Sequence, residues 1–413
     1  MRLPIAATLL AALLCGPAQA AETIRVAFID PLSGPFANLG EAEVRHFQIA
    51  IEGINARGGV LGGRHLELVS FDNKASPQES VLALKQVIDQ GIRYIVQGNG
   101  SGVAHALLDT LDKHNRRNPD QSVMYLNYAA VDPVLTNEKC NFLHFRFDAD
   151  SDMKMAAITD VLAANKAISK VYLLNQDYAF GHAVVRAARA MLGAKRPDVQ
   201  IVGDDLHPLG KVKDFSAYVT KIKASGADAV ITGNWGNDLT LLIRASREAG
   251  LKVEYFTYYG GLTGTPPAVG EAGVGHLKMV SQWHANAAGT ATEKLVLAYR
   301  ERFKGAKDDM FYSTPLTTME MLAKGIEQAR SAEPLKVARA LEGMKWMSDT
   351  GEVTMRADNH QLLQPLFVST FAKADGRNPR LDTERTGFGF RTDRRIEAKD
   401  TAMATTCRME RPN

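Results

Sequence analysis

The chain has 413 residues, 45% of them hydrophobic, and a formal charge of +3 from 49 basic and 46 acidic side chains. This near-balanced charge excludes the strongly basic surface typical of proteins that bind nucleic acid or anionic membranes, so we expect neither as a partner. The length exceeds what one hydrophobic core usually supports and predicts two domains.

The first twenty residues have the pattern of a secretory signal peptide. Arg2 precedes an apolar run, and Ala18 and Ala20 flank Gln19 as the small residues of a cleavage site. Leu14, rather than glycine or alanine, precedes Cys15, which argues against a lipoprotein signal. No later apolar stretch approaches the roughly 20 residues that cross a bilayer. We therefore expect residues 1–20 to be removed and the mature chain to be a soluble protein of the periplasm.

Strand-like and helix-like segments alternate from Thr23 onward. The strands are predicted at 23–32, 64–73, 93–98 and 123–130, and the helices at 40–59, 76–91 and 101–114. The first helix carries one apolar face, made of Val44, Phe47, Ile51 and Ile54. A capping box of Ser76 and Glu79, with Pro77 at the first helical position, opens the second. These units predict a parallel sheet covered on both faces.

The alternation restarts after a connecting strand at 141–148. Strands are predicted at 170–178, 199–205, 227–235 and 253–259, and helices at 151–165, 181–195, 214–226 and 236–250. This pattern predicts a second α/β domain of the same kind, although no repeat of individual residues relates the two.

Further helices, at 292–303 and 317–344, and strands, at 352–359 and 365–376, follow two complete α/β units. We infer that the chain crosses between the domains more than once, as in a hinged two-lobe receptor. The predicted fold is α/β, with two doubly wound parallel-sheet lobes joined by a multi-strand hinge. Lobe I takes residues 21–147 and 284–360, lobe II takes 148–283 and 361–390, and 391–413 form a C-terminal tail.

Two cysteines remain after signal cleavage, Cys140 and Cys407. In an oxidising compartment such a pair favours a disulfide, the alternative being two buried thiols. The bridge would tie the C-terminal tail to the body of the protein.

A glycine-rich turn, GNGSG at residues 98–102, lies between a predicted strand and a helix. Unpaired backbone N–H groups and the helix dipole favour an anion at such a position. The turn lacks the lysine of a P-loop, and Val103 replaces the third glycine of a dinucleotide fingerprint. We expect Ser101 and the neighbouring N–H groups to hold a group such as a carboxylate. The alternative is a tight turn that only packs the helix on the strand.

Ligands of open parallel sheets bind beyond the carboxyl ends of the strands. Aromatic side chains recur at those ends in this sequence: Phe36, Tyr128, Tyr178, Phe180, Trp235, Tyr258 and Tyr259. Because only 7% of the chain is aromatic, this concentration favours an apolar, flat-walled cleft over rings that merely pack under loops.

The strand ends carry no histidine and acid beside a serine or cysteine, and no two carboxylates that form an evident acid and base pair. Cys140 with His144 is a weak metal signal, and His182 at a helix start reads as solvated. We therefore expect a binding protein rather than an enzyme, with no cofactor and no metal.

Four segments in order resemble the periplasmic leucine/isoleucine/valine-binding proteins, the type I solute-binding proteins of branched-chain amino acid class ABC importers. The segments are AFIDPLSGPFANLGE, INARGGVLGGRHLELVSFDNKASP, AAVDPVLT and KDFSAYVTKIKASGADAVI. The resemblance covers essentially the whole mature chain. It implies two lobes that close on a small ligand, an inner-membrane permease as partner, and a monomer.

The resemblance also implies roles for individual residues. The family's ligand carboxylate is held here by Ser101 and the N–H of Gly102, and by Ala129 and Ala130. The family's ammonium contacts fall at Val131 and Tyr259. The second-lobe aromatic positions of the family fall at Phe180 and Trp235.

The resemblance implies a threonine and an acid at these two positions in the amino-acid binders, and this sequence has neither the threonine hydroxyl at Val131 nor the carboxylate at Tyr259. An unpaired ammonium in a closed cleft costs several kcal/mol. We therefore favour an apolar or aromatic carboxylate as ligand over a branched-chain amino acid, for which Asp177 would have to pair with the ammonium. A ligand-sensing receptor subunit of the same fold, without a transport role, is the alternative function.

Overall fold

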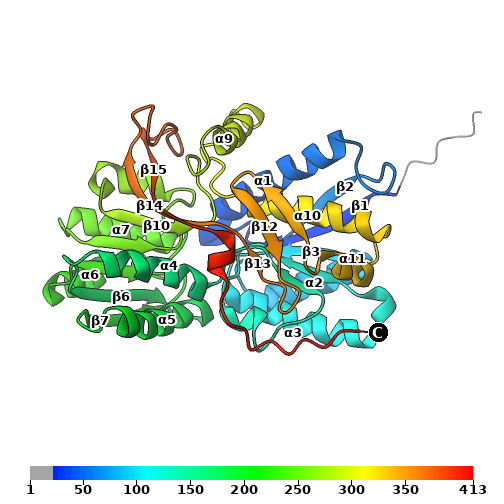
Figure 1. Ribbon diagram of the computed structural model, residues 1–413, viewed down its shortest axis with the longest axis horizontal. Helices are drawn as coiled ribbons and strands as arrows, with labels where there is room; N and C mark the ends of the chain where they lie inside the picture. Colours follow the sequence, from blue (N-terminus) through cyan, green and yellow to red (C-terminus); the bar gives the residue numbers. More distant parts are fainter. Residues whose placement is uncertain (1–21, 413) are drawn as a thin grey trace, which may run out of the picture.

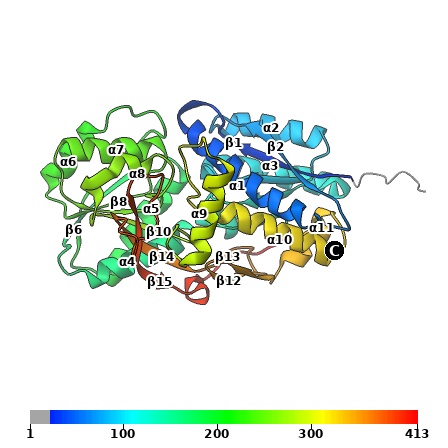
Figure 2. The same cartoon turned by 90° about the horizontal axis from the view of Figure 1, so that it is seen from above.

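The computed structural model describes residues 22–412, so the predicted signal peptide at 1–20 lies outside the described residues. The chain forms two α/β lobes side by side (Figures 1 and 2), each built on its own sheet. The predicted fold class is confirmed. No helix within 22–412 is both long and apolar enough to cross a membrane.

Lobe I contains a five-stranded parallel sheet in the order β2-β1-β3-β4-β5. Its strands are β1 (Ile24–Asp30), β2 (Leu66–Asp72), β3 (Tyr94–Gln97), β4 (Met124–Asn127) and β5 (His144–Arg146). Alternate residues of β1 enter different cores, since Phe28 packs on one face and Ile29 on the other. Both faces of this sheet are therefore buried, as expected for parallel strands.

The helices of lobe I cover the two faces of this sheet. The first face is covered by α1 (Ala37–Ala56), α10 (Thr314–Ala329) and α11 (Pro334–Leu341), and the second by α2 (Pro77–Asp89) and α3 (Ser101–Arg117). Ser76 Oγ accepts a hydrogen bond from the N–H of Glu79 at 3.4 Å, with Pro77 next in the chain. The predicted cap of this helix is therefore present.

Lobe II contains a seven-stranded sheet in the order β15-β14-β10-β9-β8-β6-β7. The parallel strands are β6 (Lys170–Gln176), β7 (Gln200–His207), β8 (Ala229–Thr232), β9 (Glu254–Thr257) and β10 (Leu277–Ser281), and the antiparallel ones are β14 (Leu366–Lys373) and β15 (Phe388–Ile396). The helices on one face are α4 (Ser151–Ala164) and α5 (Ala179–Lys195), and on the other α6 (Ser216–Ser225), α7 (Asn237–Glu248) and α8 (Thr265–Val269).

A small antiparallel sheet and one helix complete the chain. The sheet consists of β11 (Lys345–Ser348), β12 (Gly351–Met355) and β13 (Leu362–Leu363), and the helix is α9 (Thr290–Arg302). Short 3-10 turns are η1 (Gly34–Phe36), η2 (Pro119–Gln121), η3 (Pro133–Thr136), η4 (Gly270–Gly273) and η5 (Ala398–Thr401). The chain passes between the lobes after β5, after β10, after β13 and again after β15 (Figure 1).

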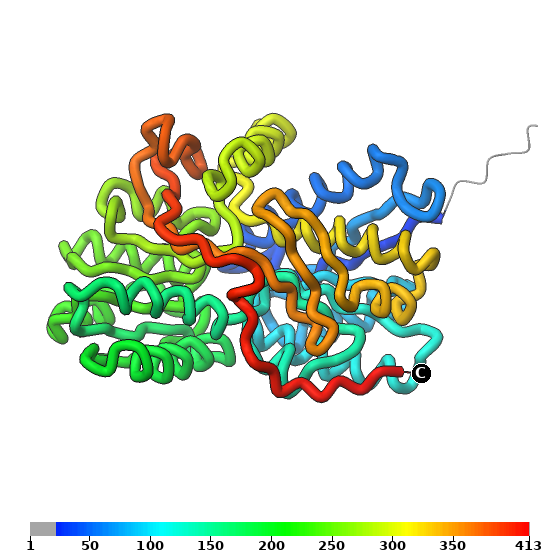
Figure 3. The backbone as a smooth tube through the Cα atoms, in the orientation of Figure 1, coloured from blue at the N-terminus to red at the C-terminus, as the bar shows by residue number. Residues whose placement is uncertain are grey.

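The last strand, β15, lies where no strand is predicted and crosses the predicted start of the tail. We expected the tail to begin at residue 391, but β15 continues to Ile396, which pairs with Leu366 of β14. The tail then runs across lobe I (Figure 3), where Cys407 forms a disulfide with Cys140 with 5.7 Å between their Cα atoms. This disulfide is the one that the cysteine count predicts. The other lobe boundaries stay a prediction.

Candidate ligand-binding site

The GNGSG turn between β3 and α3 is shaped by two of its glycines. A Cβ on Gly98 would lie 2.7 Å from the Tyr128 ring, and Gly100 has a φ of +92° at the cap of α3. Ser101 then begins the helix, where the first N–H groups lack intrahelical partners. Ser101 Oγ accepts a hydrogen bond from the N–H of Asp132 at 3.2 Å. Among residues 22–412 no acceptor is hydrogen-bonded to the Ser101 hydroxyl, so its hydrogen can meet an anion at the positive end of α3.

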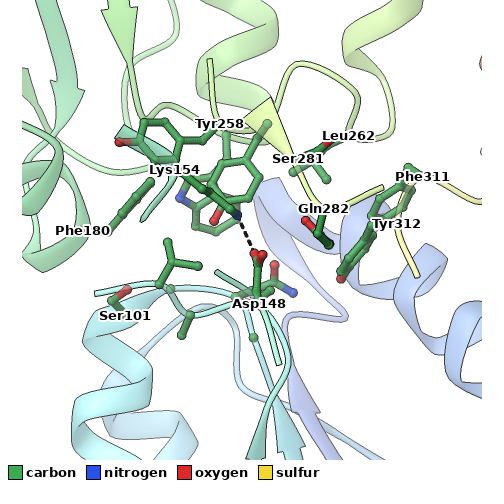
Figure 4. A pocket seen from close by; sticks show the side chains of 18 of the residues that line it. Ser101, Asp148, Lys154, Phe180, Tyr258, Leu262, Ser281, Gln282, Phe311 and Tyr312 are labelled. Carbon is green, nitrogen blue, oxygen red and sulfur yellow. Dashed lines mark hydrogen bonds and ion pairs between the residues drawn. The ribbon is translucent and has the colours of Figure 1, made fainter. Parts of the chain in front are cut away.

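This turn forms one wall of a cavity between the lobes, at the carboxyl ends of both sheets (Figure 4). The cavity is lined by the residues Glu43, Gly98, Asn99, Gly100, Ser101, Ala129, Ala130, Val131, Asp148, Lys154, Tyr178, Phe180, Trp235, Tyr258, Tyr259, Gly261, Leu262, Met279, Ser281, Gln282, Phe311 and Tyr312. The volume of the cavity that water can reach is about 50 Å³. This is a few times the roughly 10–15 Å³ that one water needs. Closed lobes therefore leave room for a compact ligand only.

The aromatic residues predicted from lobe II come together as the opposite wall. Phe180 lies 5.4 Å from Tyr258 and 5.8 Å from Tyr259 between ring centroids, both edge to face. The indole N–H of Trp235 donates to the hydroxyl of Tyr178 at 2.7 Å. The ring edges and faces give this wall the flat, apolar character that the sequence predicts.

The lobes also touch at the rim of the cavity. Phe36 of η1 stacks on Trp235 with ring centroids 4.3 Å apart. Gly236 follows the tryptophan with a φ of +57°, and a Cβ there would lie 2.8 Å from Phe36. The pair therefore joins a lobe I turn to a lobe II turn in the closed arrangement.

Most of the predicted binding residues line the cavity, but Gly102 and Tyr128 do not. Gly102 lines a neighbouring, more open cavity. Tyr128 is fully buried within lobe I, because it continues the alternation of Met124 and Leu126 onto the face that packs against α1. The expectation that its ring lines the ligand cleft is wrong.

Asp177, the residue considered for a ligand ammonium, also lies outside the cavity. Its carboxylate is 2.9 Å from Nε2 of His182, and both side chains are more than half exposed. Asp177 is therefore not placed to pair with a ligand in the closed cleft.

Two charged residues that the sequence reading did not select lie in the cavity wall. Lys154, in the first turns of α4, extends its Nζ to within 2.6 Å of Oδ2 of Asp148, which follows β5 (Figure 4). Asp148 follows a strand end and could have been found by the rule that located the other loops. Lys154 has no comparable signal in the sequence. Both side chains are almost fully buried.

Burial and a neighbouring aromatic ring both act on this ion pair. Burial raises the pKa of Asp148 above its ordinary value, although the charge of Lys154 works in the opposite direction. Lys154 Nζ also lies 5.0 Å above the ring centroid of Tyr259, a cation–π contact. The Tyr259 ring thus supports the ammonium of Lys154.

A second acid, Glu43 of α1, reaches the cavity from lobe I. Its Oε1 accepts from the hydroxyl of Tyr312 at 2.6 Å, and its Oε2 lies 2.8 Å from the Tyr128 hydroxyl oxygen. The same hydroxyl lies 2.6 Å from Oδ2 of Asp30, and Asn99 also donates to Glu43. One hydroxyl hydrogen cannot serve two carboxylates, so this geometry calls for an additional proton.

The pKa values of the two acids agree with a shared proton. Burial raises the pKa of Asp30 to about 7, and burial together with the charge of Asp30 raises the pKa of Glu43 to about 8. The higher pKa of Glu43 favours the shared proton on this side chain, which then donates to the oxygen of Tyr128 while the hydrogen of Tyr128 goes to Asp30.

Two hinged α/β lobes that enclose a helix start on one side and aromatic rings on the other define a two-lobe ligand-binding protein. The sequence pattern of the periplasmic binding protein family matches residues 23–377. The chain belongs to that family, and the resemblance that the sequence indicates is confirmed.

Three known proteins are similar to this chain. Leu/Ile/Val-binding protein homolog 4 of Brucella melitensis is 30% identical over 410 residues, which cover 97% of this chain and 96% of that protein. A leucine-, isoleucine-, valine-, threonine- and alanine-binding protein of Brucella ovis, solved in a closed conformation, is 28% identical with a TM-score of 0.82, covering 95% of this chain and 100% of that one. A solute-binding protein of an ABC transporter from Rhodopseudomonas palustris, in complex with p-hydroxybenzoic acid, is 23% identical with a TM-score of 0.77. The match covers 91% of this chain and 98% of that one. This last likeness concerns the fold alone.

Proposed function

We propose that this protein is the periplasmic substrate-binding subunit of an ABC importer, which captures a small carboxylate between its lobes and delivers it to an inner-membrane permease. The observation that carries the proposal is Ser101 at the start of α3, with a hydroxyl hydrogen free to bind an anion and aromatic rings opposite. The signal-peptide pattern and the disulfide support a periplasmic location. We propose a monomer without cofactor, metal or nucleic-acid partner.

Within this function, the cavity favours a carboxylate with an apolar or aromatic body over a branched-chain amino acid. The relatives point both ways, since the Brucella proteins are named for amino acids and the Rhodopseudomonas palustris protein holds p-hydroxybenzoic acid. Of the acids in the cavity, Glu43 has a raised pKa and hydrogen-bonds with Tyr312, Tyr128 and Asn99, and Asp148 is paired with Lys154. A ligand ammonium at Asp148 would lie beside the ammonium of Lys154, and like charges repel each other in a buried site.

The first test identifies the ligand and its class. Mass spectrometry of ligand released from purified protein is combined with thermal shifts over aromatic acids, aliphatic acids and the amino acids leucine, isoleucine and valine. A ligand at about 100 times its Kd adds roughly 2.7 kcal/mol of stability, which moves the melting temperature by a few degrees. We expect the largest shift from an apolar or aromatic carboxylate. A larger shift from leucine or valine would contradict this ligand class but not the carboxylate site.

The second test separates an importer from a sensor. Uptake of the labelled ligand is measured in cells that lack the chromosomal gene, with and without the gene restored on a plasmid. We expect restored uptake, and a Ser101→Ala copy should restore less at limiting ligand. Normal uptake without the protein, together with a ligand-dependent change in gene expression, would favour the sensing receptor.

A further inference from the structure

The Lys154–Asp148 pair has hydrogen-bonding capacity that the protein does not use. A lysine ammonium carries three N–H donors, and within the described part of the chain Lys154 Nζ hydrogen-bonds only Oδ2 of Asp148, at 2.6 Å. Oδ1 of the same carboxylate is buried and has no partner among residues 22–412. Buried carboxylate oxygens are normally satisfied, so this acceptor calls for a donor that comes from outside the chain.

The pair is held in place independently of any ligand. The side-chain amide of Gln361 donates to the backbone oxygen of Asp148 at 2.8 Å. Lys154 lies in the first turns of α4, and its backbone N–H donates to the backbone oxygen of Asp150. The ring of Tyr259 lies beneath the ammonium. Ser281 Oγ, at the end of β10, lines the same cavity and is also buried without a partner in the described residues. The polar groups therefore form a fixed cluster on an otherwise aromatic wall.

The charges of this cluster decide what it can bind. A ligand ammonium would find Asp148 as a counter-ion but would lie beside the ammonium of Lys154. A ligand carboxylate would find Lys154 but would lie beside Asp148. A neutral group that donates one hydrogen bond and accepts another leaves the ion pair intact. It donates to Oδ1 of Asp148 and accepts from a free N–H of Lys154. Because burial raises the pKa of Asp148, a further donor to its free oxygen also stabilises the charged carboxylate.

We propose that Lys154 and Asp148 form a specificity subsite for a neutral hydroxyl group of the ligand. Its substrate class is then a compact hydroxy-carboxylate, with the carboxylate at Ser101 and the hydroxyl between Nζ of Lys154 and Oδ1 of Asp148. Figure 4 shows Ser101 to one side of the pair in the same cavity. This inference rests on the proposed function, because it assumes a carboxylate at Ser101.

The test compares matched probes that differ only in the hydroxyl. Isothermal titration measures the affinity for benzoate and 4-hydroxybenzoate, for 3-phenylpropanoate and 3-(4-hydroxyphenyl)propanoate, and for hexanoate and 6-hydroxyhexanoate, with leucine as the zwitterion. We expect the hydroxylated member of at least one pair to bind about 10- to 100-fold more tightly, the usual effect of hydrogen bonds to charged groups.

The double variant Lys154→Met with Asp148→Asn should abolish this preference. It removes both charges together, which avoids the unpaired buried charge that makes a single substitution destabilising. We expect the preference to fall below about 3-fold while the affinity for the unhydroxylated probe changes little. Lys195→Met is the matched control, since Lys195 lies 2.6 Å from Asp160 in an ion pair outside the cavity. The control should keep the full preference.

Each other result overturns the inference. Equal affinity within every pair of carboxylates overturns the hydroxyl subsite and leaves the carboxylate site standing. The same follows if the preference survives in the double variant, or if leucine binds more tightly than every hydroxylated probe. Failure of all the carboxylates to bind, with folded protein, overturns the proposed ligand class together with the inference.

Discussion

The shared proton of Asp30 and Glu43 predicts a pH dependence of stability that one substitution should reduce. Glu43→Gln keeps the size and shape of the side chain and removes its titration. The pKa of Glu43 is raised from 4.5 to about 8, so the folded state holds a proton that the unfolded state has already lost between these values. The free energy of unfolding of the wild type must therefore fall as the pH rises from about 5 to about 8.

The size of the effect follows from the shift in the pKa. Each pKa unit corresponds to about 1.4 kcal/mol, so the full shift amounts to something on the order of 3–5 kcal/mol. The raised pKa of Asp30 reflects the same shared proton, and the two shifts do not add. We expect the wild type to lose on the order of 1 kcal/mol per pH unit relative to Glu43→Gln across this window.

Urea denaturation of both proteins at several pH values between 5 and 9 measures this difference. Glu52→Gln is the control, because Glu52 lies on the same helix but is exposed and has a pKa lowered by a hydrogen bond from Arg302. Its unfolding free energy should run parallel to that of the wild type over this pH range. If the Glu43→Gln curve is also parallel to the wild type, the two acids do not hold a proton and the reasoning fails.

Three further variants, two single and one double, test the site and the tail. Ser101→Ala should weaken binding of the identified ligand by roughly 1–3 kcal/mol in titration calorimetry; unchanged affinity with a lower melting temperature would mean that the turn is only structural. Phe36→Ala removes the stack on Trp235 and should weaken the same binding by about 0.5–1.5 kcal/mol beyond the lost contact area; equal affinity would show that this contact does not stabilise closure. Cys140→Ser with Cys407→Ser opens a link across 267 residues and should cost up to about 5 kcal/mol of stability to urea. The unreduced wild type should show no thiol on labelling after denaturation, and two labelled thiols would contradict the disulfide.

The fold could be predicted because local patterns and tertiary structure agree for most of the chain. Buried strands between amphipathic helices leave few alternatives to a parallel sheet. The prediction failed at β15, whose residues beyond Phe390, including Arg391 and Arg394, we assigned to the tail. This strand lies at the edge of the sheet, and charged side chains are common on such strands because one side of the backbone faces solvent.

The walls of the site could also be predicted, since both come from loops at strand ends. Glu43 was missed because a glutamate in a helix usually faces solvent. Glu43 is, however, spaced at helical intervals from the buried residues Leu39, His46 and Ala50 of α1. Val44, which we placed on the apolar face, is only half-buried. The helical period was correct, but the assumption that every position on the buried face is apolar was not.

The error at Tyr128 has a similar origin. The rule that ligands bind beyond strand ends selects a loop, but it does not say which of its side chains point toward the ligand. Side chains alternate along an extended segment, so Tyr128 shares the face of Leu126 and packs inside lobe I. Its neighbour Ala129 lies in the cavity wall. Strand-end loops therefore need the alternation of the strand to separate residues that contact a ligand from those that support the loop.

The proposed hydroxyl subsite has a consequence for how a compact ligand would select the closed state. Ser101 belongs to lobe I, and Lys154 belongs to α4 of lobe II, whereas Asp148 lies in the segment that joins them. A ligand shifts the equilibrium between open and closed lobes only by its difference in affinity for the two states. In the proposed arrangement, a carboxylate with no hydroxyl for Lys154 and Asp148 would bind Ser101 whether the lobes are open or closed. A hydroxy-carboxylate that reaches both ends would gain its second set of hydrogen bonds only on closure, so the proposed hydroxyl subsite would couple recognition to the closed conformation.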